Sequence, residues 1–280
     1  MSASGLPFDD IRTLCQMLPP PDGEAMAAVR RRNAGLAKPV GSLGTLEEIA
    51  VWVAGWQGNA APQIVRPLTA LFAGSHGVAQ RPELAGAAAD IAGRLAQAAA
   101  GGAAVNQICA THDIGLKVFE LALPHPVRDI TRHAAFEEKD CTATIAFGME
   151  ALAGGSDLIC LGELGGGSDI AVAAMLTALL GGTPHDWLED MSPGLRETKI
   201  TLVEEALTCH AGHLGDPLEV LRRLGGREIA AAAGAILAAR IQRIPIILDS
   251  LAIAAAATVV FSLNTSAVDH CLAGHVAGPV

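Results

Sequence analysis

The sequence predicts an α/β protein in which a mostly parallel sheet is flanked by helices, with a small helical unit at the N-terminus. Short apolar runs alternate with longer helical stretches along most of the chain, and this alternation is typical of parallel sheets covered by helices. Alanine dominates many of the helical stretches, which favours helices packed closely on a sheet.

The N-terminal residues predict a helical arm over residues 1–40, and residues 41–280 are expected to form one α/β domain. Prolines and a glycine in the stretch 18–23 break the arm into two short helices. Thr45 and Glu48 then form a capping-box pattern. This pattern predicts a helix that starts at Thr45 and continues to about residue 56.

Apolar runs bounded by turn residues predict the strands of the sheet. These runs are residues 68–73, 116–121, 158–162 and 245–248, with a fifth strand expected at 269–275. The stretches between them predict helices at residues 82–100, 140–153, 168–180 and 227–240. The polar stretch 185–194 is predicted to be a mobile loop.

The segment LGELGGGSDIAVAAMLTALLGG, residues 161–182, carries the strongest functional signal. It predicts the end of a strand, then Glu163, three glycines, and a helix from Ser168. A glycine turn lets a ligand approach the backbone, and a helix start presents N–H groups that favour an anion. Ligands of parallel α/β sheets bind at the carboxyl ends of the strands. Glu163 is therefore the candidate catalytic carboxylate, and the alternative is an ordinary strand-to-helix connection.

The composition excludes some classes of partner. The chain has 280 residues, a formal net charge of −10, 3% aromatic residues and no tyrosine. A nucleic-acid-binding protein would need a basic surface and stacking rings. The most apolar run, residues 251–263, is shorter than the ~20 residues that span a bilayer. No basic-then-apolar signal segment opens the chain, so a cytoplasmic protein without membrane or nucleic-acid partners is expected.

The cysteine and histidine pattern gives no metal or cofactor prediction. The six cysteines are scattered and form no CxxC pair, which indicates reduced, buried thiols rather than disulfides. Cys209, His210 and His213 share one predicted helix and could bind a metal with Asp216. A structural role is the more common one for such histidines, and no metal and no cofactor are predicted.

Several motifs follow one another along the chain in a recognisable order. They are KPVGSLG with LE at residues 38–47, SHGV at 75–78, GGAAVN at 101–106, GELGGG at 162–167, and GGREIA with AGA at 225–235. This set resembles the nicotinate-nucleotide–dimethylbenzimidazole phosphoribosyltransferase family, whose corresponding segments are KPPGSLGxLE, (D/N)HGV, GGAAIN, GEMGIG and GGxEIAAMAGA. The resemblance runs from about residue 5 to the end.

The resemblance implies a Rossmann-like large domain, a smaller helical domain and a homodimer. It implies that a nitrogen of 5,6-dimethylbenzimidazole attacks the ribose anomeric carbon of nicotinate mononucleotide. Nicotinate leaves, and the product is α-ribazole phosphate, which is used in cobalamin biosynthesis. This chemistry needs a base, a phosphate anchor and a dry pocket for the aromatic ring.

The resemblance also indicates which side chains contact the substrates. The expected substrate-binding residues are Ser75, His76, Gly165, Gly166, Gly167, Ser168 and Lys199. For Lys199, which fits a family helix bearing a lysine near the active site, a solvated helix lysine is the alternative.

Two departures from the family pattern bear on activity. Gly278 occupies the position of the family's general-base glutamate, which implies impaired catalysis with Glu163 as the substitute base and sole carboxylate in the pocket. The chain then ends at Val280, so the resemblance implies that further C-terminal helices are missing. Asp169 stands in the family's Asn-Thr-Thr segment, and it is expected to cap the helix and face solvent rather than oppose the phosphate.

Three functions therefore remain open at this point. The chain is an impaired phosphoribosyltransferase, an inactive paralogue that binds or senses ligands, or one subunit of a heteromer whose partner supplies the carboxylate. Apolar surface left by the missing helices predicts self-association or a related partner subunit.

Overall fold

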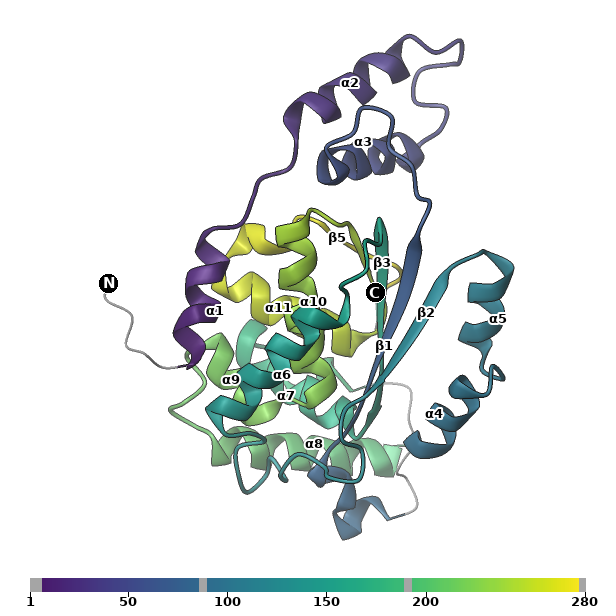
Figure 1. Cartoon of the computed structure of the whole chain (residues 1–280). Helices are drawn as coiled ribbons and strands as arrows, with labels where there is room; N and C mark the ends of the chain where they lie inside the picture. Colours follow the sequence, from purple (N-terminus) through teal and green to yellow (C-terminus); the bar gives the residue numbers. More distant parts are fainter. Residues whose placement is uncertain (1–6, 86–89, 189–192, 277–280) are drawn as a thin grey trace.

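The sheet is parallel throughout and has the strand order β2-β1-β3-β4-β5 (Figure 1). The computed structural model describes residues 7–85, 90–188 and 193–276. The strands are β1 (Pro67–Ser75), β2 (Gly115–Glu120), β3 (Leu158–Gly166), β4 (Ile246–Leu248) and β5 (Cys271–Ala273). The predicted fold class is confirmed, including the fifth strand, although that strand is shorter than expected.

Helices cover both faces of the sheet. They are α1 (Pro7–Gln16), α2 (Gly23–Ala34), α3 (Thr45–Gln57), α4 (Ile91–Ala99), α5 (Ala104–Thr111), α6 (Glu138–Ala151), α7 (Ser168–Leu180), α8 (Pro193–Cys209), α9 (Pro217–Leu224), α10 (Arg227–Gln242) and α11 (Leu251–Leu263). Among the described residues, short 3₁₀ turns occur in the connections at η1 (Gly77–Gln80), η2 (Pro82–Leu84), η3 (Pro184–Asp186) and η4 (Thr265–Val268). In Figure 1, α6 and α10 lie on one face of the sheet, and α4 and α5 lie on the other.

Glycine and alanine allow α6 and α10 to pack at very short range. A Cβ on Gly148 of α6 would stand 1.9 Å from the carbonyl oxygen of Ala231 in α10. A Cβ on Gly234 of α10 would stand 1.9 Å from the carbonyl oxygen of Ile145 in α6. The two backbones are thus in direct contact, as the alanine-rich composition predicts, and α10 is pressed against β1 and β3.

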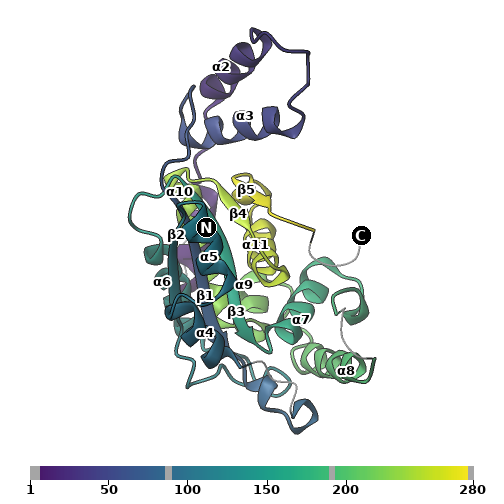
Figure 2. The same cartoon turned by 90° about the vertical axis from the view of Figure 1, so that its right-hand side faces the viewer.

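Helices α2 and α3 pack against each other as an arm that projects beyond the end of the sheet (Figures 1 and 2). Asp22 caps α2, because its Oδ1 accepts hydrogen bonds of 3.0 Å from the backbone N–H groups of Glu24 and Ala25. The predicted capping box at Thr45 is wrong. Gly44, with a φ of 54°, is the N-cap of α3 and makes no side-chain cap bond.

Three further element predictions need correction. The single helix expected over 82–100 is wrong, because α4 begins only at Ile91, where Asp90 accepts a 2.8 Å hydrogen bond from the N–H of Gly93. Strand β3 does not end at residue 162 but continues to Gly166. The loop expected over 185–194 is partly helical, since η3 ends at Asp186 and α8 begins at Pro193. Residues 86–89 and 189–192 lie outside the described residues.

Within the described ranges, no helix is both long enough and apolar enough to cross a membrane.

Candidate functional site

The junction between β3 and α7 is tighter than the sequence predicts. Strand β3 stays paired with β1 through Gly74↔Gly165 and Ser75↔Gly166, so only Gly167 remains to turn the chain. Gly167 has a φ of 85° and is the N-cap of α7, a conformation that favours glycine. A Cβ on Gly167 would stand 2.8 Å from the Cβ of Ala79, so η1 lies directly against the turn.

Glu163 is a half-buried residue of β3 that points toward Gly165. A Cβ on Gly165 would stand 2.7 Å from Oε2 of Glu163, and this oxygen is buried without a hydrogen-bond partner in the described residues. Burial, followed by the nearby charge of Glu228, raises the pKa of Glu163 to about 7. At neutral pH this carboxyl can therefore both accept and release a proton.

His76 and Glu228 form a completely buried pair beside Glu163. His76 follows β1, and Glu228 lies in the first turn of α10. Nε2 of His76 is 2.5 Å from Oε1 of Glu228, and neither side chain is exposed. Burial works against a charge on His76, but the charge of Glu228 and the hydrogen bond to it outweigh that effect, so the pKa of His76 is raised. The two side chains form a buried ion pair.

Two glycines make room for this pair. A Cβ on Gly74 would stand 1.8 Å from Oε2 of Glu228. A Cβ on Gly226 would stand 2.4 Å from Cε1 of His76 and 2.5 Å from Oε1 of Glu228. Any side chain at either position would displace the pair. We refer to His76, Glu163 and Glu228 as the buried cluster.

The buried cluster corrects one prediction and adds one residue. Glu163 is not the sole carboxylate at this place, because Glu228 lies close enough to raise the pKa of Glu163. Sequence reasoning missed Glu228, although a single glutamate after Gly225-Gly226 and before a run of alanines was an available signal. An ionisable residue in an otherwise apolar buried helix requires a partner.

The other predicted substrate-binding side chains already have partners within the protein. The hydroxyl of Ser75 donates to the carbonyl of Leu123 at 2.9 Å. The hydroxyl of Ser168 donates to the carbonyl of Gly165 at 3.3 Å. Lys199 of α8 donates a hydrogen bond to the carboxylate of Asp169.

Asp169 does not cap α7, and that prediction is wrong. The N-cap is Gly167 and no side chain caps the helix, while the Asp169 carboxylate is paired with Lys199. The side chain of Lys199 is only 13% exposed, so it requires a counter-charge at close range. Asp169 supplies this charge and neutralises the lysine at the start of α7.

Residues 277–280, and with them Gly278, lie outside the described residues. The alternative metal site at Cys209, His210 and His213 has a different explanation: Nε2 of His210 is 2.9 Å from the carbonyl oxygen of Ile130. In the described part of the chain, no three His, Cys, Asp or Glu side chains are grouped to hold a metal. The six cysteines are free thiols.

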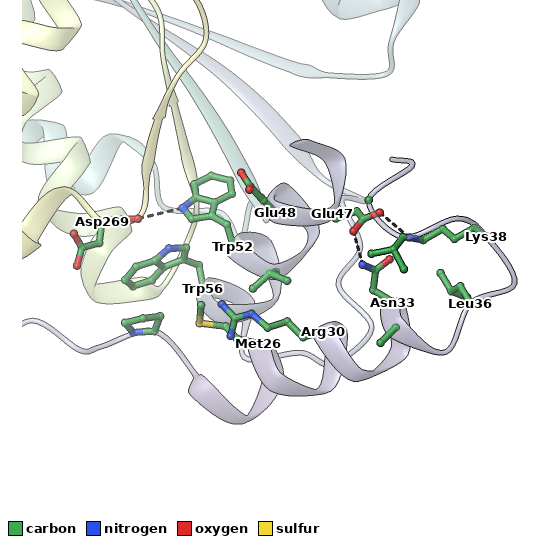
Figure 3. A pocket seen from close by; sticks show the side chains of 15 residues that line it. Met26, Arg30, Asn33, Leu36, Lys38, Glu47, Glu48, Trp52, Trp56 and Asp269 are labelled. Carbon is green, nitrogen blue, oxygen red and sulfur yellow. Dashed lines mark hydrogen bonds and ion pairs between the residues drawn. The ribbon is translucent and has the colours of Figure 1, made fainter. Parts of the chain in front are cut away.

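A separate cavity of about 630 Å³ lies in the arm (Figure 3). Met26, Trp52 and Trp56 contribute apolar surface to it, and Arg30 and Glu48 contribute charge. Figure 3 shows Met26 and Arg30 on the side of α2 that faces α3, and the Trp52 ring directed away from α2 toward Asp269. Nε1 of Trp52 donates to the carbonyl of Asp269 at 3.1 Å, which ties the arm to the segment before β5.

Comparison with known proteins assigns the family. A family model described as a phosphoribosyltransferase matches residues 18–278. The nicotinate-nucleotide–dimethylbenzimidazole phosphoribosyltransferase of Rhizobium etli is 55% identical over 99% of this chain and 82% of its own length. The chain belongs to the nicotinate-nucleotide–dimethylbenzimidazole phosphoribosyltransferase family.

Other members agree with this assignment. A Sinorhizobium nicotinate-nucleotide–dimethylbenzimidazole phosphoribosyltransferase is 54% identical over 99% of this chain and 83% of its own length. The crystal structure of the enzyme of the same name from Thermus thermophilus superposes with a TM-score of 0.78 at 30% identity, over 91% of this chain and 82% of that one. The predicted family resemblance is thus confirmed.

Proposed function

We propose that the chain transfers the phosphoribosyl group of nicotinate mononucleotide to 5,6-dimethylbenzimidazole or a similar base. Family membership supports the reaction class, since the relatives carry the name of this transferase. A nitrogen of the benzimidazole forms a bond to the ribose anomeric carbon, and the bond from that carbon to nicotinate breaks. The benzimidazole N–H proton must pass to a base, and nicotinate leaves with the bonding electron pair.

The carboxyl of Glu163 is the observation that supports a proton acceptor at this site. Its pKa is raised to about 7, and a general base works best when its pKa lies near the operating pH. We assign Glu163 the role of this base. The resemblance puts Gly278 where the family has its general-base glutamate, which leaves that role to another residue.

The β3–α7 junction supports a phosphate anchor. Gly165, Gly166, Gly167 and Ser168 lead into the N-terminus of α7, where free backbone N–H groups favour an anion. Lys199 lies beside the same turn through its ion pair with Asp169. We propose that these residues hold the phosphate, and that Ser75 and His76 shape the adjoining end of β1. The enzyme is proposed to act as a homodimer or with a related subunit.

A turnover assay tests the proposal. The purified protein is incubated with nicotinate mononucleotide and dimethylbenzimidazole, α-ribazole phosphate is followed by chromatography, and binding of each ligand is measured by calorimetry. Product formation is expected, and Glu163→Gln should lower kcat by about 10²-fold. Glu150→Gln, on the exposed side of α6, is the control.

The alternatives inferred from Gly278 give different results in the same assay. Binding of both ligands without product would indicate a ligand-binding paralogue. Product only in a co-purified complex would indicate a heteromer whose partner supplies the base. Absence of both binding and product would overturn the proposed function.

A further inference from the structure

The buried cluster contains three polar atoms that have no hydrogen-bond partner among the described residues. They are Nδ1 of His76, Oε2 of Glu163 and Oε2 of Glu228. Buried polar groups are nearly always paired, and each unpaired one costs free energy. Three such atoms on three side chains lower stability, and their grouping therefore indicates a functional site.

The sheet brings these side chains together. Gly74 and Gly165 are partners in the register of β1 and β3, so their missing side chains would point to the same face of the sheet. The carboxyl of Glu228 lies over Gly74, and that of Glu163 lies over Gly165. The two carboxyl groups therefore occupy neighbouring positions on one face, and His76 is bonded to the first of them.

We propose that His76 and Glu228 are positioning residues for Glu163: the pair holds the Glu163 carboxyl over Gly165 and controls how readily it takes up the proton released in the transfer. This inference rests on the proposed function. It gives His76 and Glu228 a role without substrate contact, which agrees with their complete burial.

Opposite charges in the pair act on Glu163 in opposite directions. The negative charge of Glu228 raises the pKa of Glu163, and the positive charge of His76 lowers it by a smaller amount. Asp169 of α7 also raises it slightly, but Asp169 is paired with Lys199 of α8. Asp249, after β4, lies near Gly162 and thus on the opposite face of the sheet from Glu163.

The proposal predicts two shifts of opposite sign. In Glu228→Gln the like charge beside Glu163 is removed, so the midpoint of Glu163 titration should fall by about one pH unit. In His76→Gln the two carboxyls are left without a cation and must share a proton, so the midpoint should rise by about one unit. Glu150→Gln should leave the midpoint unchanged.

The titration is measured by NMR on the full chain labelled with ¹³C at glutamate side-chain carboxyls. The Glu163 signal is identified by its loss in Glu163→Gln. The pH dependence of kcat/KM for product formation should shift in the same directions. Unchanged midpoints in both variants, or shifts of the same sign, overturn the inference.

A second measurement covers variants that do not fold. In the wild-type protein, ¹⁵N NMR should place the midpoint of His76 ring titration above the ordinary value of 6.5, and a midpoint at or below that value would overturn the inference. Both NMR readouts are independent of turnover. If the wild-type protein forms no product but the Glu163 midpoints of the two variants shift as described, the proposed function is refuted. The coupling within the buried cluster then still holds.

Discussion

The buried cluster and the arm cavity both contain charged side chains, but these are excluded from water in the cluster and line an open space in the arm. In the cluster, His76 and Glu228 are completely buried and fill space left by two glycines. The arm cavity is an open space of about 630 Å³ with Trp52, Arg30 and Glu48 among its lining residues. Charges interact much more strongly where water is excluded, so the cluster can control the protonation state of Glu163. The arm cavity instead provides apolar surface that is open to solvent.

The largest effect is expected at the buried ion pair of the cluster, compared with an exposed ion pair. Glu228→Ala should lower the free energy of unfolding by about 3–5 kcal/mol, because it leaves His76 buried without its partner. The control is Glu137→Ala, whose ion pair with Arg128 is 2.8 Å long and exposed, with an expected loss below ~1 kcal/mol. Urea denaturation followed by circular dichroism measures both, and equal losses would contradict the ion-pair assignment.

The pH dependence of stability gives the next effect. The folded protein holds a proton on Glu163 with a pKa of about 7, above the ordinary value of 4.5. Wild-type protein should therefore lose up to about 3 kcal/mol of stability as pH rises from about 4.5 through 7. Glu163→Gln cannot ionise and should be more stable than wild type at pH 8.5, but not at pH 4. A pH-independent difference would show that Glu163 has an ordinary pKa.

Adding a methyl group at Gly74, which leaves room for the cluster, should lower the free energy of unfolding by a smaller amount. Gly74→Ala places a Cβ 1.8 Å from Oε2 of Glu228, and such overpacking typically costs about 1–3 kcal/mol. Gly115→Ala in β2 is the matched control, since its Cβ would meet Leu68 at an ordinary 3.4 Å. Thermal denaturation compares the two variants. The glycine argument fails if Gly74→Ala is as stable as Gly115→Ala.

Asp169→Asn tests whether the carboxylate beside the β3–α7 turn weakens binding of the substrate phosphate. Removing the carboxylate frees Lys199 and removes a like charge that costs about 1 kcal/mol near a solvated phosphate. The KM for nicotinate mononucleotide should therefore fall about fivefold in steady-state assays. Asp140→Asn on α6 serves as the control. A higher KM would mean that Asp169 holds Lys199 in place for the substrate.

The smallest effect is expected in the arm. Trp52→Phe removes the 3.1 Å hydrogen bond to the carbonyl of Asp269 and should cost about 1 kcal/mol or less. Trp187→Phe is a useful reference, because Nε1 of Trp187 has no hydrogen-bond partner within the described residues. Scanning calorimetry should show the larger loss for Trp52→Phe. The reverse order would indicate that the Trp52 bond does not hold the arm.

Local patterns predicted the elements that glycines delimit. The helix expected at 168–180 matches α7 at both ends, because Gly167 and Gly181 flank it in conformations with positive φ. The end of β3 was missed for a non-local reason. The composition of residues 163–166 is typical of a turn, and only pairing with the equally extended β1 keeps this stretch in the sheet.

The site was predictable in part for the same reason. Glu163 could be selected because strand, glycines and helix are adjacent in the sequence. The partnership of His76 with Glu228 could not, since it depends on α10 reaching the end of β1 from a distant part of the chain. The raised pKa of Glu163 follows from that tertiary arrangement and has no local sequence signal.

Two of the three tryptophans, Trp52 and Trp56, lie in the arm, and the chain has no tyrosine. Intrinsic fluorescence of this protein therefore reports mainly on the arm, and the third tryptophan, Trp187, reports on the core of the α/β part against which it packs. An unfolding curve recorded by emission follows mainly the arm, whereas one recorded by backbone absorption follows the whole chain. Where the two curves separate, the arm opens before the rest of the molecule.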